Sequence, residues 1–285
     1  MGDNGAGRAA AGVMKVFIFS SEGIPMVSSF LLLGALVGMV PDGSMNEVPV
    51  VHKMDQLRQK ETKFLNPEYL VFLPDAATSD KKLPLLIYLH GSGGRGDDIK
   101  KVKGQAMGVW RGLNKFGKAP CIVVAPQCAA KTEGSEKSTW IPADLNQLLE
   151  QVQATLPVDP ARIYLTGNSM GGYGTWVWGA HNPEHFAAIA PISGGTGRGG
   201  PKDVTKEIDR WAKNLARVPV YAFVGSRDKV VPAERSESLV AAIVKAGGKQ
   251  AKLKVYPDQG HNARQVVLST PEFYDWLFSK TKTPK

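Results

Sequence analysis

The chain has 285 residues, of which 43% are hydrophobic, 8% aromatic and 21% charged. These values are ordinary for a globular protein that buries a real core, and they predict one large domain rather than two small ones. The net charge of +9 allows an anionic partner, but the 35 lysines and arginines are scattered along the chain. Because the sequence contains no basic helix with interleaved aromatic residues and no zinc-finger spacing, we expect solvated surface charge and no nucleic-acid partner.

The N-terminus carries an uncharged apolar stretch over residues 26–40, MVSSFLLLGALVGMV. It is shorter than the ~20 residues that a membrane-spanning helix needs, and it is typical of a signal-peptide apolar region. Three features argue against a signal peptide. The only basic residues before the stretch are Arg8 and Lys15, the acidic Glu22 lies between them and the stretch, and no A-x-A cleavage site follows. We predict that residues 1–46 form a leader that directs export to the periplasm or outside the cell, leaving no membrane span in the mature chain. The alternative is a disordered leader on a cytoplasmic protein.

From Tyr69 onward, short apolar runs alternate with helical patterns. Several runs are apolar on both faces, as strands covered by helices on each side must be. The alternation predicts an α/β fold with a doubly wound, mostly parallel sheet flanked by helices, in a domain over residues 47–280 followed by a basic tail, 281–285. The predicted strands are residues 69–74, 83–89, 121–126, 162–167, 187–193, 218–225 and 251–257.

Three helices are predicted from apolar residues at helical spacing. They lie around residues 145–156, around residues 239–244, where Gly247 and Gly248 form the stop, and after Pro271. The segment between Ser193 and Val218 is too short for a large lid domain, so we expect an open site. The two cysteines, Cys121 and Cys128, are too few for a disulfide framework and about 20 Å apart in extended chain, which predicts two buried free thiols.

The sharpest motif is GNSMG at residues 167–171, between a predicted strand and a helical segment. A serine hydroxyl is a poor nucleophile unless it is exposed, next to a base and near donors for the developing oxyanion. A G-x-S-x-G turn meets these needs by placing the serine on a strained strand-to-helix bend, and its glycines let the helix and the strands approach closely. The motif and its context predict Ser169 as a nucleophile.

The partners of such a serine follow it in the order acid, then histidine. Asp228 follows the predicted strand 218–225, whose carboxyl end delivers side chains to the active-site edge of the sheet. Asp203, Asp209 and Asp258 are rival acids. His261 comes after a strand and a turn and is the predicted base, whereas His181 and His185 follow the nucleophile and His52 lies near the start of the chain.

A glycine-rich segment, HGSGGRG at residues 90–96, follows another predicted strand. An oxyanion hole needs backbone N–H groups aimed at one point, and glycines let a loop take that shape. We predict that the amides of Ser92 and Met170 form the pair. The same segment also reads as G-x-G-x-x-G, a dinucleotide-binding pattern, but no acidic residue closes a second strand ~20 residues later, as that pattern requires.

Six segments form a recognisable set: LHGSGGRGDD, VVAPQC, VDPARIYLTGNSMGGYGTW, FAAIAPISGG, RDKVVP and GH. Together they resemble the esterase branch of the α/β-hydrolases. That branch includes the phospholipase/carboxylesterase group, bacterial "predicted peptidases" and enzymes similar to feruloyl esterases and dienelactone hydrolases. The resemblance runs from Tyr69 to the C-terminus. It implies that Ser169, Asp228 and His261 form a catalytic triad, with Ser92 and Met170 as the oxyanion hole.

The sequence departs from this family pattern at three places. Val224 stands where a histidine is usual, Asn168 stands where an apolar residue is common, and residues 262–264 (Asn-Ala-Arg) lack the tryptophan often found after the histidine. These departures leave the triad intact and put the substrate in question.

The resemblance implies hydrolysis of carboxylic esters through an acyl-enzyme, with no metal or organic cofactor. The expected substrate is a small-molecule ester or an ester on a carbohydrate or phenolic polymer, chosen by loops at residues 101–118 and 129–141. A thioesterase or a serine peptidase would use the same triad, although a peptidase usually needs added binding elements. A non-catalytic binding module is the remaining alternative, but such proteins usually lack a triad member and this sequence retains all three.

Overall fold

The computed structural model describes residues 48–74, 77, 81–117, 120–130, 139–197 and 204–282. The predicted leader, residues 1–46, lies outside this range, as do the last three residues of the predicted basic tail, so the signal-peptide prediction stays a prediction. Within the described ranges, no helix combines the length and the apolar character that crossing a bilayer requires.

The centre of the fold is an eight-stranded sheet in the order β1-β2-β4-β3-β5-β6-β7-β8. Strand β2 runs antiparallel to both of its neighbours, and all the other neighbouring strands are parallel. The strands are β1 (Val50–Lys53), β2 (Leu65–Phe72), β3 (Leu83–Leu89), β4 (Ile122–Cys128), β5 (Val158–Asn168), β6 (Ala188–Ile192), β7 (Val220–Gly225) and β8 (Ala251–Tyr256).

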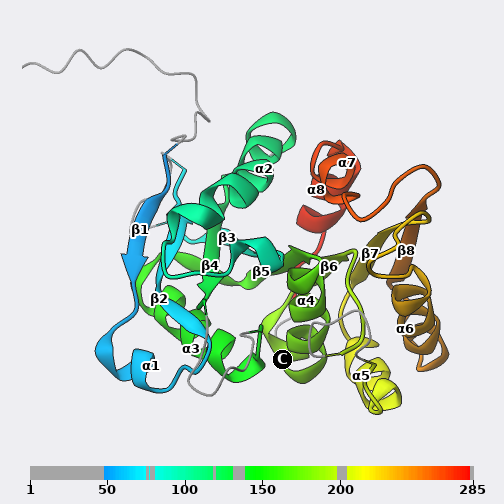
Figure 1. The fold of residues 1–285 in the computed structure, drawn as a ribbon. Coiled ribbons are helices and arrows are strands. Elements are labelled where there is room, and N and C mark those ends of the chain that lie inside the picture. Colours follow the sequence, from blue (N-terminus) through cyan, green and yellow to red (C-terminus); the bar gives the residue numbers. More distant parts are fainter. Residues whose placement is uncertain are drawn as a thin grey trace, which may run out of the picture. The chain divides into compact units, whose positions relative to one another are not determined.

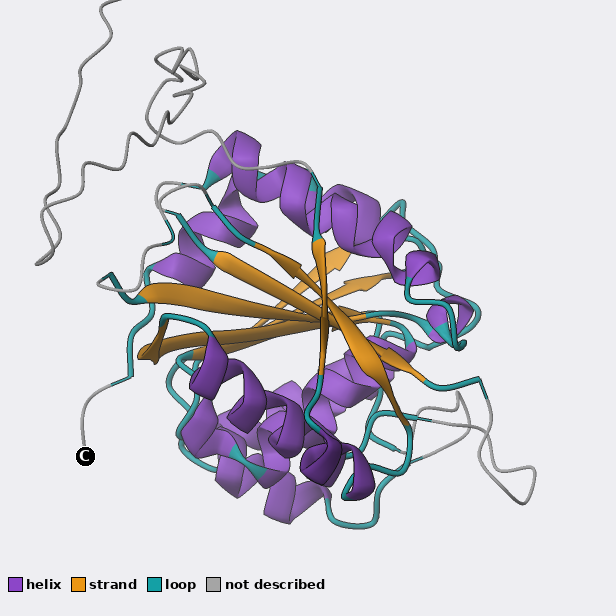
Figure 2. Cartoon of the chain, turned by 90° about the vertical axis from the view of Figure 1, so that its left-hand side faces the viewer, coloured by secondary structure: helices purple, strands orange, loops and turns teal. Residues whose placement is uncertain are grey.

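Helices cover both faces of this sheet, as the twisted sheet seen nearly end-on between two helical layers shows (Figure 2). One face packs against α3 (Pro142–Thr155), α4 (Met170–His181), α5 (Ile208–Leu215) and α6 (Glu234–Lys245). The other face packs against α2 (Lys100–Phe116), α7 (Arg264–Leu268) and α8 (Pro271–Phe278) (Figure 1). The remaining elements are the short helix α1 (Gln56–Lys60) and two 3₁₀ turns, η1 (Ser92–Gly94) and η2 (Pro183–His185).

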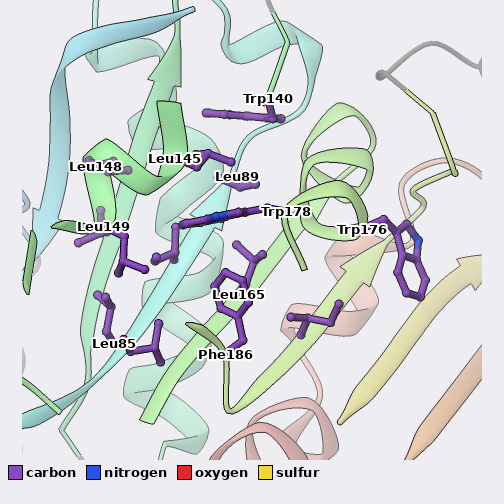
Figure 3. Packing of buried hydrophobic residues seen from close by; sticks show 14 of the residues in the cluster. Leu85, Leu89, Trp140, Leu145, Leu148, Leu149, Leu165, Trp176, Trp178 and Phe186 are labelled. Atoms are coloured by element: carbon purple, nitrogen blue, oxygen red, sulfur yellow. The ribbon is translucent and has the colours of Figure 1, made fainter. Parts of the chain in front are cut away.

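Helix α4 is the most deeply buried helix of the first layer, and Trp178 holds it in place. The Trp178 indole lies among the leucines of α3 and of the strands (Figure 3). Its ring packs edge-on against Phe186 at 4.9 Å between centroids, and its N–H donates to Asn146 Oδ1 at 2.8 Å. Because nearly every residue of α4 is buried, the start of the helix is fixed to the sheet.

The fold predicted from the sequence is confirmed: the sheet is doubly wound, mostly parallel and flanked by helices. All seven predicted strands are present, and the three predicted helices correspond to α3, α6 and α8. Gly247 follows α6 with φ +93°, which fits its predicted role as a helix stop. Strand β6 ends at Ile192 and α5 begins at Ile208, which leaves no room for a large lid. Cys121 and Cys128 are free and buried, as predicted.

Two features differ from expectation. Strand β1 is absent from the prediction because its side chains are exposed or half-buried, so it lacks an apolar signature. Most of residues 101–118, expected to be a specificity loop, belongs to helix α2. The glycines and lysines of α2 hide its buried stripe, which consists of Val102, Ala106, Val109, Trp110, Gly112 and Leu113.

Candidate active site

Ser169 occupies the bend between the end of β5 and the start of α4. Its backbone has φ 55° and ψ −120°, a conformation that a residue with a side chain adopts only under strain. Two hydrogen bonds enforce it: the Ser169 amide donates to the Ile192 carbonyl at 3.0 Å, and the Ser169 carbonyl accepts from the Tyr173 amide at 3.0 Å. The surrounding structure therefore holds the serine on a sharp turn, as the motif predicts.

Glycines make this turn sterically feasible. A Cβ atom at Gly171 would lie 1.9 Å from the Leu89 carbonyl oxygen, and one at Gly172 would lie 2.5 Å from the Ile192 carbonyl oxygen. Both distances are far inside van der Waals contact. The first turn of α4 can therefore sit against β3 on one side and β6 on the other only without side chains at these positions.

Ser169, His261 and Asp228 are joined in one hydrogen-bonded chain. The distance from Ser169 Oγ to His261 Nε2 is 2.8 Å, and that from His261 Nδ1 to Asp228 Oδ2 is also 2.8 Å. With the imidazole neutral and its proton on Nδ1, the serine hydroxyl donates to Nε2 and Nδ1–H donates to the carboxylate. This geometry permits proton transfer from Ser169 to His261.

Asp228 and His261 are delivered by loops at the carboxyl ends of β7 and β8. The two loops are bonded together, because the Arg227 amide donates to the Gln259 carbonyl at 3.0 Å. The side chain of Asp228 is 0% exposed, whereas that of His261 is 27% exposed. The Asp228 carboxylate is therefore shielded from water, while the His261 imidazole remains accessible to solvent.

The carboxyl group of Asp228 remains ionised at this buried position. Burial alone would raise its pKa, but the hydrogen bond from His261 and the amides of Val231 and Val230 outweigh that effect and hold the pKa below its ordinary value. Both amides donate to Oδ1 at 2.8 Å. A fixed negative charge therefore faces Nδ1 of the imidazole.

The rival residues lie elsewhere. Asp258 forms an ion pair with Arg227 at 2.8 Å on the surface, and Asp209 is exposed on α5. Asp203 lies outside the described residues. His181 is exposed, with Nδ1 2.8 Å from the Val177 carbonyl, and His185 packs edge-on against Trp178. His52 contacts Tyr69 with tilted rings, 5.7 Å between centroids, at the far edge of the sheet.

The two predicted oxyanion amides flank the serine. Met170 follows it directly, and Ser92 lies in the loop after β3, where a Cβ atom at the preceding Gly91 would be 3.6 Å from Ser169 Cβ. The Gly91 amide already donates to Gln105 Oε1 at 3.0 Å. Ser92 is the first residue of η1 and Met170 is the first residue of α4. The amides of the first residues of a helix have no acceptor within that helix.

Known proteins resemble this chain over most of its length. The family model "Putative esterase" matches residues 66–276. The chain belongs to this esterase family. "Probable feruloyl esterase C" of Aspergillus niger is 26% identical over 199 residues, which cover 68% of this chain and 67% of the relative.

Two solved structures extend the agreement to the fold. A thermostable esterase matches 82% of this chain and 63% of its own length, with a TM-score of 0.65 and 28% identity. A ferulic acid esterase matches 80% of this chain and 98% of its own length, with a TM-score of 0.61 and 20% identity. The chain thus spans about two thirds of the Aspergillus relative and of the thermostable esterase. The predicted identity as an α/β-hydrolase esterase, a hydrolase of carboxylic esters, is confirmed at the level of the family.

The glycine-rich loop of this esterase is held by two polar side chains whose roles the sequence did not reveal. His90 is fully buried, its Nδ1–H donates to the Gly91 carbonyl at 2.6 Å, and its Nε2 accepts from the Cys128 amide at 3.0 Å. Burial lowers the pKa of His90 to about 4, with a smaller contribution from the charge of Arg95 and a hydrogen bond to Gly91 that opposes both. Gln127 donates to the carbonyls of Gly94 and Asp98 at 2.8 and 2.9 Å.

This arrangement disfavours the dinucleotide-binding reading of residues 91–96. In that motif the glycines open a helix whose N-terminus holds a pyrophosphate. Here they form only the 3₁₀ turn η1, and α2 begins at Lys100. The signal that could have identified the anchors was a polar residue at the end of each apolar run: His90 after β3 and Gln127 near the end of β4.

A pocket of about 690 Å³ lies away from Ser169. Its lining includes Pro160, Ala187, Pro219 and Gln250, which lie near the starts of β5, β6, β7 and β8. Ser169 lies at the opposite, carboxyl edge of the sheet. Among the described residues, no group of three or more His, Cys, Asp or Glu side chains could hold a metal ion.

Proposed function

We propose that the protein hydrolyses carboxylic esters with Ser169 as nucleophile, His261 as general base and Asp228 as the residue that orients and stabilises the imidazole. The observation that carries this proposal is the hydrogen-bonded chain from Ser169 Oγ through His261 to Asp228, with 2.8 Å at both steps. Family membership supports the same reaction class.

The reaction has two halves. His261 Nε2 takes the proton of Ser169 Oγ as that oxygen attacks the ester carbonyl, and the amides of Ser92 and Met170 donate to the oxyanion of the tetrahedral intermediate. Collapse expels the alcohol, which leaves with the proton from His261, and Ser169 holds the acyl group. Water, deprotonated by His261, then attacks the acyl-enzyme. When the second tetrahedral intermediate collapses, His261 returns that proton to Ser169 Oγ, and the acid is released.

The proposed substrate is an ester of a phenolic acid or a short acyl group. Two observations support this proposal: the short segment between β6 and α5, which leaves the site open to bulky substrates, and the likeness to proteins named as feruloyl esterases. Thioesters and peptides remain the alternatives. We also propose that residues 1–46 direct export, on the evidence of the apolar stretch at residues 26–40.

The testing experiment compares p-nitrophenyl acetate, methyl ferulate, an acyl thioester and a peptide anilide under identical conditions. The expected result is turnover of the two oxygen esters, with a pre-steady-state burst of p-nitrophenol equal to the enzyme concentration. Faster turnover of the anilide than of either ester would reject the proposed esterase activity in favour of a peptidase activity. The absence of turnover and of a burst with all four compounds would favour a binding module.

A further inference from the structure

Two residues that depart from the family pattern, Asn168 and Arg264, are joined through a buried tyrosine. Asn168 precedes Ser169, and Arg264 begins helix α7, three residues after His261. Tyr88 lies between them: its hydroxyl is 2.6 Å from Asn168 Oδ1, and Arg264 Nη1 is 3.2 Å from the hydroxyl oxygen. The loop of the proposed base is therefore connected to the turn of the proposed nucleophile.

Strand register places Tyr88 at this position. Tyr88 of β3 pairs with Thr166 of β5, and side chains two residues apart on a strand share a face, so Tyr88 and Asn168 lie on the same side of the sheet. Tyr88 is 0% exposed. Burial raises its pKa, opposed in part by Arg264, so the phenol keeps the proton that it donates to Asn168. Arg264 donates to the same oxygen and so fixes the direction of that single O–H.

A second branch leads from Arg264 to the oxyanion loop. The same Nη1 atom lies 3.3 Å from Gln105 Oε1, which also accepts from the Gly91 amide at 3.0 Å. A Cβ atom at Gly91 would lie 3.2 Å from Asn168 Nδ2, so this loop and the nucleophile turn are packed directly together. One guanidinium nitrogen therefore contacts both branches of a network that spans three segments: those of His261, Ser169 and Ser92.

The other side of Arg264 faces a cavity. A pocket of about 410 Å³ between α2 and α7 is lined by Arg264 and by Gly104, Gly108 and Arg111 of α2. The two helices lie next to each other on the same face of the sheet (Figure 1). Arg264 is half-buried, and its described hydrogen-bond partners are neutral. Removal of the side chain would leave a space that a small cation could reach from this pocket.

We propose that Arg264 is a positioning residue for the hydrolytic reaction, holding the nucleophile turn through Tyr88 and Asn168 and the oxyanion loop through Gln105 and Gly91. It contacts no reacting atom and acts through these four residues. The proposal rests on the proposed function. A displacement of about 1 Å at a reacting centre can lower a rate about 100-fold, so loss of this network should lower kcat while leaving KM nearly unchanged.

The experiment measures kcat and KM for p-nitrophenyl acetate in the wild type, Arg264→Ala and Arg111→Ala. We expect Arg264→Ala to lower kcat about 100-fold with KM changed less than about threefold. Guanidinium chloride at low, non-denaturing concentration should restore kcat about tenfold with saturation, and urea at equal concentration should not. Arg111→Ala is the matched control, because it removes a cation from the same pocket without breaking the network. It should stay within about twofold of the wild type and not respond to guanidinium.

A second variant keeps the inference testable if Arg264→Ala does not fold. Tyr88→Phe removes the hydroxyl of one of the two branches and should lower kcat about tenfold, with KM changed less than about threefold. Wild-type kcat in Tyr88→Phe would overturn the inference. So would wild-type kcat in a folded Arg264→Ala, or a loss of kcat in that variant that guanidinium does not relieve. Failure of a fluorophosphonate to label Ser169 in the wild type would instead overturn the proposed function, so the two failures are distinguishable.

Discussion

The Nδ1–H of His261 donates to Oδ2 of Asp228 at 2.8 Å, while Oδ1 of the same carboxylate accepts two backbone amides. The carboxylate is thus held from both sides, and its orientation fixes the imidazole with Nε2 directed at Ser169. Asp228→Asn should keep the fold and lower kcat by about 10⁴, because the amide neither fixes the correct tautomer nor stabilises the imidazolium. Steady-state kinetics with p-nitrophenyl acetate measure this loss.

Asp258→Asn is the control for the acid. Asp258 is close to His261 in the sequence, but it is paired with Arg227 on the surface. We expect kcat to fall less than about tenfold, since an exposed ion pair contributes only about 0–1 kcal/mol to the stability of the fold. If Asp258→Asn were inactive and Asp228→Asn active, Asp258 would be the acid of the triad instead of Asp228. If both variants were active, the protein would use a Ser–His dyad.

Ser169→Ala should lower kcat by a factor on the order of 10⁶, as in other triads, with an unchanged circular dichroism spectrum. A fluorophosphonate followed by peptide mass spectrometry should label the wild type at Ser169 alone. Ser193 is the informative competitor, because it also has a positive φ, 46°, and its buried hydroxyl has no hydrogen-bond partner among the residues that the structure describes. Labelling at Ser193 or Ser92 would reject Ser169 as the nucleophile.

The stability of the protein should fall as the pH is lowered from 7.5 to 5, and His90 should account for part of the change. Its pKa of about 4 in the folded protein lies below the ~6.5 of an exposed imidazole, so the unfolded state binds more protons between these values. The stabilisation is therefore present above pH 6.5 and declines toward pH 4, by about 2 kcal/mol at pH 5. Urea unfolding of the wild type, His90→Gln and the exposed His181→Gln measures it. His90→Gln should show the shallowest dependence on pH, and equal slopes in all three proteins would contradict the prediction.

Gly171→Ala should destabilise the protein severely. The added Cβ atom would lie 1.9 Å from a backbone oxygen of β3, and neither α4 nor the sheet can move without disturbing buried packing. We expect a loss of several kcal/mol or insoluble protein. Gly104→Ala is the control: a Cβ atom there meets nothing within 4 Å, so this substitution inside α2 should stabilise by about 0.5–1 kcal/mol. Thermal denaturation compares the two.

A truncated protein that begins at Asn46 should be soluble and keep the full kcat/KM of the whole chain. The reason is that the described strands and helices begin at Val50 and the proposed site is built from residues beyond Leu89. Kinetics and thermal denaturation of both forms are the measurement. Loss of folding on truncation would make the leader part of the domain.

The sequence by itself determined most of the sheet and the order of the site residues. A short stretch of sequence is enough to identify a buried strand, because a run such as LPLLIYL must be apolar on both faces to lie between two layers of helices. The turn at Ser169 is also local, since its glycines are required by contacts within the next few residues and with the adjacent strands. The proximity of Asp228 and His261 was predictable because parallel strands end at the same edge of the sheet. Strand β1 could not be predicted from the sequence, because an exposed edge strand carries no apolar pattern.

Only the tertiary structure decided which polar residues meet behind the site. Tyr88, Asn168 and Arg264 are far apart in the chain, and each alone reads as an ordinary residue or as a departure from a motif. They meet because β3 pairs with β5 in a register that aligns Tyr88 with Thr166, and because α7 packs on the same face. His90 and Gln127 likewise find their partners only when β4 is placed beside β3. A hydrophobic pattern specifies that a residue is buried, whereas a hydrogen bond depends on the position and direction of two atoms, which strand order and register set.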